Sequence, residues 1–296
     1  MQKEALKIVR PQQWVKNLFV FLPLFFDKHL FEIEYLLPTI VVFVAFCTIS
    51  SSIYCLNDIF DVESDRVHLQ KRERPIASGK ISKQTAYIIM IICATVSAIS
   101  IIIGDFSLGG NKSILGIIIL AYFLMNIAYC IGLKNKAIVD IIIIAIGFVL
   151  RVLAGGFASG IWLSQWIILM TFLLSLFLAL AKRKDDVVLF QKTGEKTRKN
   201  VDTYNTPFLN AAISIVGSVT LVSYIMYTLS PEVTERFGSQ NLYLTSGFVL
   251  AAIMRYIQIT FVDENSGNPT RILLHDRFIQ TCIIGWLFSF GIIIYL

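Results

Sequence analysis

The sequence predicts an all-α, polytopic membrane protein, and composition and hydropathy support this. Hydrophobic residues make up 56% of the 296-residue chain and charged residues only 16%, and the mean hydropathy is +0.70. Apolar stretches of about 20 residues, the length at which a helix crosses a bilayer, recur along the chain. Because the polar stretches between them are short, we expect a single membrane domain over residues 1–296.

Hydropathy predicts nine membrane-spanning helices. The first is the weakest, because Pro23, Asp27 and Lys28 interrupt it, and a re-entrant segment is the alternative there. The nine segments, in chain order, are about 17–31, 36–56, 83–104, 113–132, 137–157, 162–181, 207–229, 240–261 and 276–296.

Positive charge lies mainly on one side of this predicted topology. Most of the 26 Lys and Arg residues precede the first span or follow even-numbered spans, whereas Lys28, Lys112 and Arg236 lie on the other side. By the positive-inside rule the N-terminus and the loops at about 57–82 and 182–206 face the cytoplasm. The net charge of +6 therefore needs no nucleic acid to explain it, and we expect a multi-pass protein of the cell inner (plasma) membrane.

The end of the second predicted span is rich in acidic residues. Asn57, Asp61 and Asp65 are four residues apart and share one face of a helix. Carboxylates at that spacing repel one another unless a cation lies between them, and Mg²⁺ bound by a few carboxylates and substrate phosphates would serve. An ordinary solvated loop is the alternative, but the basic run at 71–75 follows closely and could bind the same phosphates.

Further residues at the predicted membrane boundary could bind a phosphate or a lipid headgroup. Lys16 follows the N-terminal run that begins at Arg10, and Tyr129 and Lys134 end the fourth span. Each of these is explained equally well as an interfacial anchor, because aromatic rings and lysines are favoured at that depth.

Two ionisable residues fall within the fifth span. Asp140 and Arg151 are three turns apart on one face, too far for a direct bond. A charge at mid-helix costs about 2.5–3.5 kcal/mol, so such residues face a partner or a watery cavity. Both residues lining one cavity is the favoured interpretation, and separate partners on other helices is the alternative.

These residues together resemble the UbiA superfamily of intramembrane prenyltransferases. That superfamily has nine helices around a central cavity and an Asn-Asp-x-x-Asp-x-x-x-Asp motif that binds Mg²⁺ and a diphosphate. The residues that match the motif, and that the resemblance implies as metal ligands, are Asn57, Asp58, Asp61 and Asp65.

A second motif separates the branches of this superfamily. Typical members carry Asp-x-x-x-Asp after the sixth helix, whereas this chain has Lys182-Arg183-Lys184-Asp185-Asp186 there. In this it is similar to the decaprenyl-phosphate phosphoribosyltransferases. The segments that carry that similarity are 10–17, 57–77, 133–140, 147–155, 182–183 and 271–280.

The resemblance implies transfer of 5-phosphoribose from phosphoribosyl pyrophosphate (PRPP) to a polyprenyl phosphate for cell-envelope polysaccharide precursors, with pyrophosphate released. An acceptor phosphate is already anionic at pH 7, so catalysis would rest on positioning and charge stabilisation rather than on a strong base. The catalytic set would be Asp58, Asp61, Lys134 and Arg151. The substrate-binding set would be Lys16, Asn17, Arg66, Lys71, Arg72, Arg74, Tyr129, Asp140, Lys182 and Arg183.

Two other functions stay open. A UbiA-type prenyltransferase that uses a prenyl diphosphate and an aromatic acceptor would share the fold and the first motif, but the missing second Asp-rich motif disfavours it. A non-enzymatic lipid transporter is disfavoured because the charge gathers on one face. The sequence does not fix the oligomeric state, and a homo-oligomer is one option.

Overall fold

The computed structural model of the chain describes residues 2–67, 71–108, 112–194 and 200–295, and every regular element within these ranges is a helix. The chain divides into two compact units. Unit 1 comprises Met1–Lys136 and Ile146–Leu163, and unit 2 comprises Ala137–Ala145 and Ser164–Leu296. Helix α7 (Val139–Ser159) contributes residues to both. A single domain over the whole chain stays a prediction.

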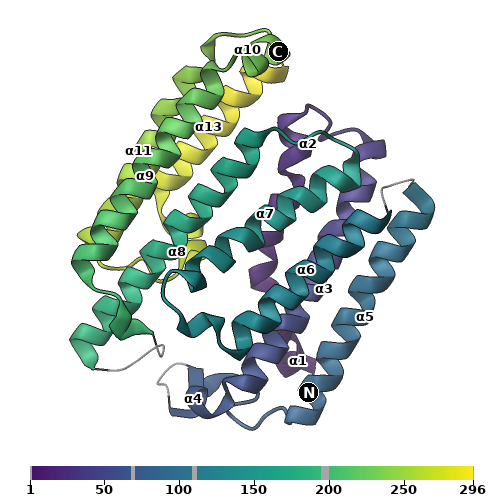
Figure 1. The fold of residues 1–296 in the computed structure, drawn as a ribbon, viewed down its shortest axis with the longest axis vertical. Helices are drawn as coiled ribbons and strands as arrows, with labels where there is room; N and C mark the ends of the chain where they lie inside the picture. Colours follow the sequence, from purple (N-terminus) through teal and green to yellow (C-terminus); the bar gives the residue numbers. More distant parts are fainter. Residues whose placement is uncertain (1, 68–70, 109–111, 195–199, 296) are drawn as a thin grey trace. The chain divides into compact units, whose positions relative to one another are not determined.

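Unit 1 is built around the long helix α3, against which α5 and α6 pack side by side (Figure 1). A 3-10 helix, η1, also lies against α3. Besides its part of α7, its helices are α1 (Gln2–Val9), η1 (Pro11–Phe21), α2 (Leu22–Phe26), α3 (Ile33–Phe60), α4 (Val62–Val67), η2 (Lys71–Glu73), α5 (Lys83–Leu108), α6 (Lys112–Ile131) and η3 (Leu133–Asn135).

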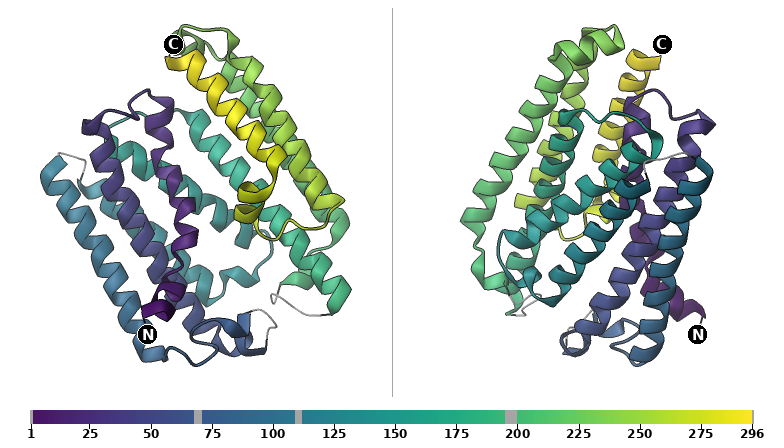
Figure 2. Two further views of the ribbon diagram at one scale, coloured as in Figure 1. Left: turned by 180° about the vertical axis from the view of Figure 1, so that it is seen from behind. Right: turned by 45° about the vertical axis from the view of Figure 1, so that its right-hand side comes forward.

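Unit 2 contains a layer of long helices in which α11 lies beside both α9 and α13 (Figure 2). Helix α8 packs against α9. Besides its part of α7, its helices are α8 (Gln165–Thr193), η4 (Val201–Thr203), α9 (Thr206–Leu229), α10 (Pro231–Phe237), η5 (Asn241–Thr245), α11 (Ser246–Phe261), α12 (Pro269–His275) and α13 (Arg277–Tyr295).

Within the described residues, 7 helices are long and apolar enough to cross a membrane, or up to 8 if α12 and α13, bent by 79°, count as one span. The predicted count of nine is not confirmed. The segment predicted as the first span forms η1 and the five-residue α2, which ends before the positive-φ residue Lys28. Neither piece is long enough by itself to cross a bilayer.

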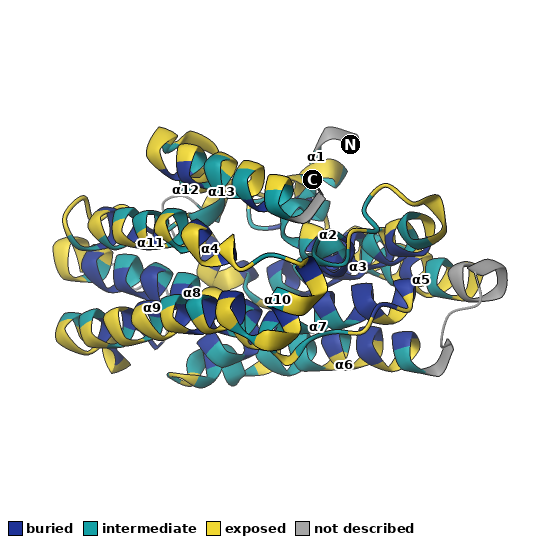
Figure 3. Cartoon of the chain, turned by 90° about the horizontal axis from the view of Figure 1, so that it is seen from above, coloured by how far each residue is buried: buried dark blue, intermediate teal, exposed yellow. Residues whose placement is uncertain are grey.

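The exposed apolar residues follow helical faces. On α9, Ile215, Val219, Val222 and Met226 are all exposed and recur every three or four residues. Figure 3 shows exposed residues along one side of this helix. A long apolar stripe that remains uncovered is what a lipid-facing helix requires, since lipid takes the place of a packing partner.

Two buried clusters hold unit 1 together. The larger joins η1, α3, α6 and α7 and includes Val20, Phe46, Tyr122 and Ala154. The close approach of α7 to η1 depends on Gly155, because a Cβ there would lie 1.9 Å from the backbone oxygen of Val20. The absence of a side chain at Gly155 therefore allows the two backbones to approach this closely.

The smaller cluster fixes the loop after α4. Ile76 and Ile81 from that loop are buried with Ile8 of α1 and with Ile59 and Val62 near the end of α3. Backbone bonds from Arg74 N to Lys71 O (2.9 Å) and from Ile81 N to Pro75 O (3.0 Å) give the loop its turns. Apolar burial thus positions a segment that is otherwise polar.

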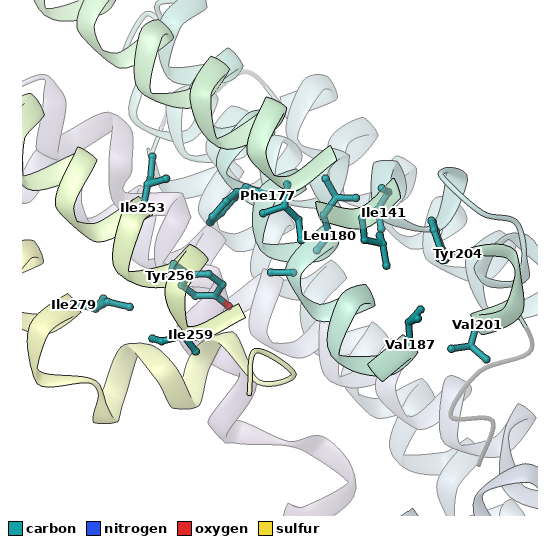
Figure 4. Close-up of a cluster of buried hydrophobic side chains, with 14 residues drawn as sticks. Ile141, Phe177, Leu180, Val187, Val201, Tyr204, Ile253, Tyr256, Ile259 and Ile279 are labelled. Atoms are coloured by element: carbon teal, nitrogen blue, oxygen red, sulfur yellow. The ribbon is translucent and has the colours of Figure 1, made fainter. Parts of the chain in front are cut away.

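Unit 2 combines an apolar core with a buried ion pair. Figure 4 shows Phe177 and Leu180 of α8 with Ile253 and Tyr256 of α11 in the core cluster. Close to it, Arg183 Nε donates to Asp140 Oδ2 at 2.6 Å, and both side chains are almost completely buried. Because both ions are removed from water, each needs the other as a counterion to offset its lost hydration.

Replacing Gly155 by Ala should lower the free energy of unfolding by about 3 kcal/mol, because either η1 or α7 must move to admit the Cβ. Chemical denaturation in detergent micelles would measure it. Gly116→Ala is the matched control, since Gly116 lies on α6 with nothing within 4 Å of its would-be Cβ, and it should be neutral or slightly stabilising. Equal stability of G155A and the wild type would contradict the close packing.

Arg183→Met should lower the free energy of unfolding by about 3–5 kcal/mol, because it strands the buried Asp140 carboxylate. Adding Asp140→Asn to that variant should recover part of the loss. Lys192→Met is the control on the same helix as Arg183: it breaks an exposed ion pair with Glu264, which lies in the loop after α11, and should cost about 1 kcal/mol or less. Denaturation midpoints of the four proteins test this, and additive losses in the double variant would contradict the pairing.

Candidate active site

The predicted acidic face exists in unit 1, at the junction of α3 and α4. Asp61 caps the C-terminus of α3, and its N–H donates to Asn57 O at 2.9 Å. The Asp65 N–H donates to Asp61 O at 2.8 Å. These i to i+4 bonds carry the helical path through the break between α3 and α4, so the three residues remain on one side.

Basic side chains from three other segments neutralise these carboxylates. Arg74 Nη1 lies 3.1 Å from Asp58 Oδ1 and 2.7 Å from Asp65 Oδ2. Arg10 Nη2 lies 2.5 Å from Asp58 Oδ1. These contacts are charge-assisted hydrogen bonds, the strongest kind available to such groups.

Lys134 provides the third cation. Its Nζ lies 2.5 Å from Asp61 Oδ1 and donates to Asn57 Oδ1 at 3.4 Å. Cys130, one turn earlier on α6, also points its Sγ at Asn57 Oδ1, at 3.6 Å. The end of α6 therefore lies against the acidic face, and three cations match three carboxylates.

Local structure explains the position of Arg10. It has a left-handed backbone conformation (φ 54°, ψ 60°) between α1 and η1, and its guanidinium lies over the Tyr54 ring at 5.1 Å. Ser51 Oγ donates to Val9 O at 2.9 Å and so ties this bend to α3. The strained conformation costs free energy and persists because its surroundings hold it.

The acidic face fits a divalent cation, which the sequence predicts here. Carboxylate and amide oxygens are the ligands that Mg²⁺ prefers. One nitrogen of Arg74 contacts both Asp58 and Asp65, so a single positive group can lie between them. Asp58 Oδ2 is buried with no hydrogen-bond partner among the described residues, which leaves a lone pair for a ligand. In those residues no three acidic, His or Cys side chains already converge on one point.

Burial raises the pKa of Asp65 above its ordinary value, although the neighbouring Arg74 guanidinium opposes this, and the Asp58 carboxylate adds to the rise. A carboxyl group in this position is held in its ionised form mainly by cations nearby. A bound metal would have the same effect.

Arg151 forms a separate basic centre within unit 1. Its guanidinium donates to Asn17 Oδ1 (2.7 Å), Gly147 O (2.7 Å) and the Tyr122 hydroxyl (2.8 Å). Lys16, adjacent to Asn17, is partly buried. Burial and the positive charges of Arg151 and Arg10 lower the pKa of Lys16 to about 8.

Asp140 belongs to unit 2, where Arg183 and Tyr204 hold it. The Tyr204 hydroxyl donates to Asp140 Oδ1 at 2.7 Å and accepts from Ile138 N–H at 2.7 Å. Burial raises the pKa of Tyr204, which keeps this hydroxyl protonated as a donor. Asp140 and Arg151 therefore each have partners on other elements, the alternative that the sequence analysis ranked second.

The acidic residues of the second cluster are engaged inside unit 2. Asp186 Oδ2 accepts from Arg183 Nη1 at 2.8 Å. Asp185 Oδ1 accepts from the Ser266 N–H at 3.1 Å, and a Cβ on Gly267 would lie 2.1 Å from Asp185 Oδ2. Lys184 Nζ lies 3.8 Å from the centroid of the Phe261 ring.

Five predicted substrate-binding residues have varied surroundings, and one of them, Lys71, acts on the Asp65 carboxyl through its charge. Arg66 pairs with the exposed Glu63 at 3.4 Å, and Arg72 is exposed. Lys71, Tyr129 and Lys182 are partly buried. The assignment of these five residues to substrate stays a prediction.

Sequence reasoning missed three residues that hold site groups in place. Arg10 was noted only as part of the N-terminal run, and its contact with Asp58 spans 48 positions. Tyr122 lies within an ordinary apolar segment, and Tyr204 lies in the polar loop at about 182–206. Of the three, only Arg10 carried a sequence signal, its charge at the predicted cytoplasmic boundary.

The chain has clear relatives over almost its whole length. The sequence profile of the UbiA prenyltransferase family matches residues 29–282. The decaprenyl-phosphate phosphoribosyltransferase of Mycolicibacterium smegmatis is 34% identical, over 98% of this chain and 92% of that protein. The enzyme of the same name from Corynebacterium glutamicum is 33% identical, over 98% and 86%.

A solved structure supports the fold independently of close sequence similarity. A UbiA homologue from Archaeoglobus fulgidus, bound to GPP and Mg²⁺, superposes with a TM-score of 0.71, covering 99% of this chain and 100% of that one at 18% identity. Together with the apolar helices, the profile match identifies a multi-pass membrane protein. The chain belongs to the UbiA prenyltransferase family.

Proposed function

We propose that the protein transfers 5-phosphoribose from PRPP to a polyprenyl phosphate and releases pyrophosphate. Two relatives that match 98% of the chain are both named decaprenyl-phosphate phosphoribosyltransferase. Because PRPP is water-soluble and basic loops favour the cytoplasmic side, the acidic face would open to the cytoplasm at the inner (plasma) membrane.

The observation that most favours a phosphoribosyl donor over a prenyl donor is the state of the second cluster. Asp185 accepts a hydrogen bond from the backbone N–H of Ser266, and Asp186 accepts one from Arg183. Both carboxylates therefore already have partners within unit 2. Basic side chains dominate the remainder of that cluster. PRPP carries phosphate at both ends of the ribose, and such a donor needs cations beyond one metal site.

Asn57, Asp58, Asp61 and Asp65 would hold Mg²⁺. When bound there, Mg²⁺ would neutralise the charge that develops on the departing pyrophosphate. Four oxygen ligands on consecutive turns suit a hard cation that shares its coordination with phosphate oxygens.

The cations on the acidic face would act on the same phosphates. Arg10, Arg74 and Lys134 contact the carboxylates directly, so each can turn a donor N–H to a diphosphate oxygen once a metal takes its place. An acceptor phosphate oxygen attacks the anomeric carbon, the bond from that carbon to the pyrophosphate oxygen breaks, and pyrophosphate leaves with the electron pair. No proton is removed, because the acceptor monoester is already anionic.

The direct test is transfer of label from PRPP to undecaprenyl phosphate by the purified protein, with and without EDTA. We expect labelled lipid that depends on Mg²⁺ and is lost on chelation. A product only from a prenyl diphosphate and an aromatic acceptor would instead establish an ordinary prenyltransferase. Absence of both products would favour the lipid-transporter alternative.

Asp61→Asn should lower kcat by more than about 100-fold, because it removes a metal-binding carboxylate and leaves Lys134 without its ion-pair partner. The melting temperature should stay close to that of the wild type, since Asp61 is partly exposed. Glu63→Gln is the matched control, because it removes an exposed carboxylate two residues away and should keep activity within about twofold. Turnover by D61N near the wild-type rate would rule out Asp61 as a metal ligand.

A further inference from the structure

Among the cations of unit 1 that are at least partly buried, Lys16 and Arg151 have no acidic partner within the residues that the structure describes. All three nitrogens of the Arg151 guanidinium donate to neutral oxygens. Lys16 Nζ makes no hydrogen bond or ion pair in that part of the chain. This contrasts with Arg10, Arg74 and Lys134, each of which has a carboxylate within 3.1 Å.

The two unpaired cations act on one another. Arg151 Nε binds the side chain of Asn17, the residue next to Lys16. The charges of Arg151 and Arg10, together with burial, hold the pKa of Lys16 at about 8, below its usual range. Like charges this close raise the free energy of both, so the fold maintains a local excess of positive charge.

Neutral contacts compensate Arg151 only in part. Its guanidinium lies 4.8 Å from the ring centroid of Tyr122, 5.2 Å from that of Phe148 and 5.6 Å from that of Phe46. Each such ring stabilises a nearby cation by about 0.5–2 kcal/mol. Arg151 is only 5% exposed, and a buried charge without a counterion is costly. The centre is therefore chemically suited to an anion brought by a ligand.

We propose that Lys16 and Arg151 bind a phosphate monoester, and that its source is the polyprenyl phosphate acceptor. A monoester carries close to two negative charges at neutral pH, which matches two cations. The assignment rests on the proposed function. Under this assignment, the diphosphate of the donor binds at the acidic face of unit 1, and the acceptor phosphate binds at Lys16 and Arg151.

The position of the pair favours the lipid over the 5-phosphate of PRPP, which has the same chemistry. Arg151 lies 12 residues into α7, about 18 Å along the helix axis from its first residue. Helix α7 is long and apolar enough to span a membrane, so the apolar chain of a lipid can lie in the bilayer beside this helix while its phosphate is bound by the protein. Arg10, which influences Lys16 and contacts Asp58, links the two centres.

The test measures binding of radiolabelled undecaprenyl phosphate to the purified protein in detergent, in EDTA and without PRPP. The wild type should prefer the phosphate to undecaprenol, the neutral lipid. Lys16→Met should weaken phosphate binding by about 10-fold or more, and Lys16→Arg should retain most of it. Lys7→Met, which removes an exposed lysine paired with Glu4, should bind as the wild type does.

Stability separates a binding role from a structural one. Lys16→Met should melt at or above the wild-type temperature without lipid, because it removes a partly buried, unpaired charge. Lipid phosphate should raise the melting temperature of the wild type more than that of K16M. If K16M does not fold, Lys16→Gln takes its place in both measurements.

Three results would overturn the proposal. Equal binding of undecaprenyl phosphate by K16M and the wild type removes Lys16 from the site. A rise in the KM for PRPP, with lipid binding unchanged, assigns the centre to the donor phosphate. Equal affinity of the wild type for the phosphate and the alcohol shows that no monoester site exists. Because this assay needs no turnover, lipid binding without transfer from PRPP would refute the proposed function and leave the site standing.

Discussion

Charge compensation inside an apolar unit is the constraint on which the rest of this structure depends. Asp58, Asp61 and Asp65 would repel one another strongly at the end of a membrane helix, and each is held by a cation from another segment of the chain. The N-terminal bend, the loop after α4 and the segment at the end of α6 each supply one of these cations. Because a buried ion without a partner costs several kcal/mol, the same contacts define the fold and assemble the candidate site.

In the proposed function, the cations that neutralise the acids would also prepare unit 1 for its substrate. A metal and a diphosphate together bring a charge pattern that can replace the existing ion pairs one for one: carboxylates turn to the metal, and Arg10, Arg74 and Lys134 turn to phosphate. Little charge is gained or lost in this exchange. Lys16 and Arg151 differ from the other cations because they have no acid to exchange, which is why a second anion is inferred there.

Unit 2 handles its charges differently. The acids Asp140, Asp185 and Asp186 are committed to Arg183, to Tyr204 and to the backbone near Ser266. Where the wider family commonly has an Asp-x-x-x-Asp pair, this chain has acids that stabilise a loop and a buried arginine. The fold is shared with an archaeal homologue at only 18% identity, and the fold alone does not specify the chemistry.

The sequence by itself determined the helical class, most of the spans and the acidic face, because hydropathy and four-residue spacing are local properties. It could not determine that Arg10 reaches Asp58, that Tyr204 holds Asp140, or that Asp140 and Arg151 have separate partners, since these contacts join residues far apart in the chain. The predicted count of nine spans is not confirmed, because at 17–31, where a re-entrant segment was the alternative, the backbone forms a 3-10 helix and a short α2. Tertiary packing decided these points, because only packing selects which of many possible partners each buried charge receives.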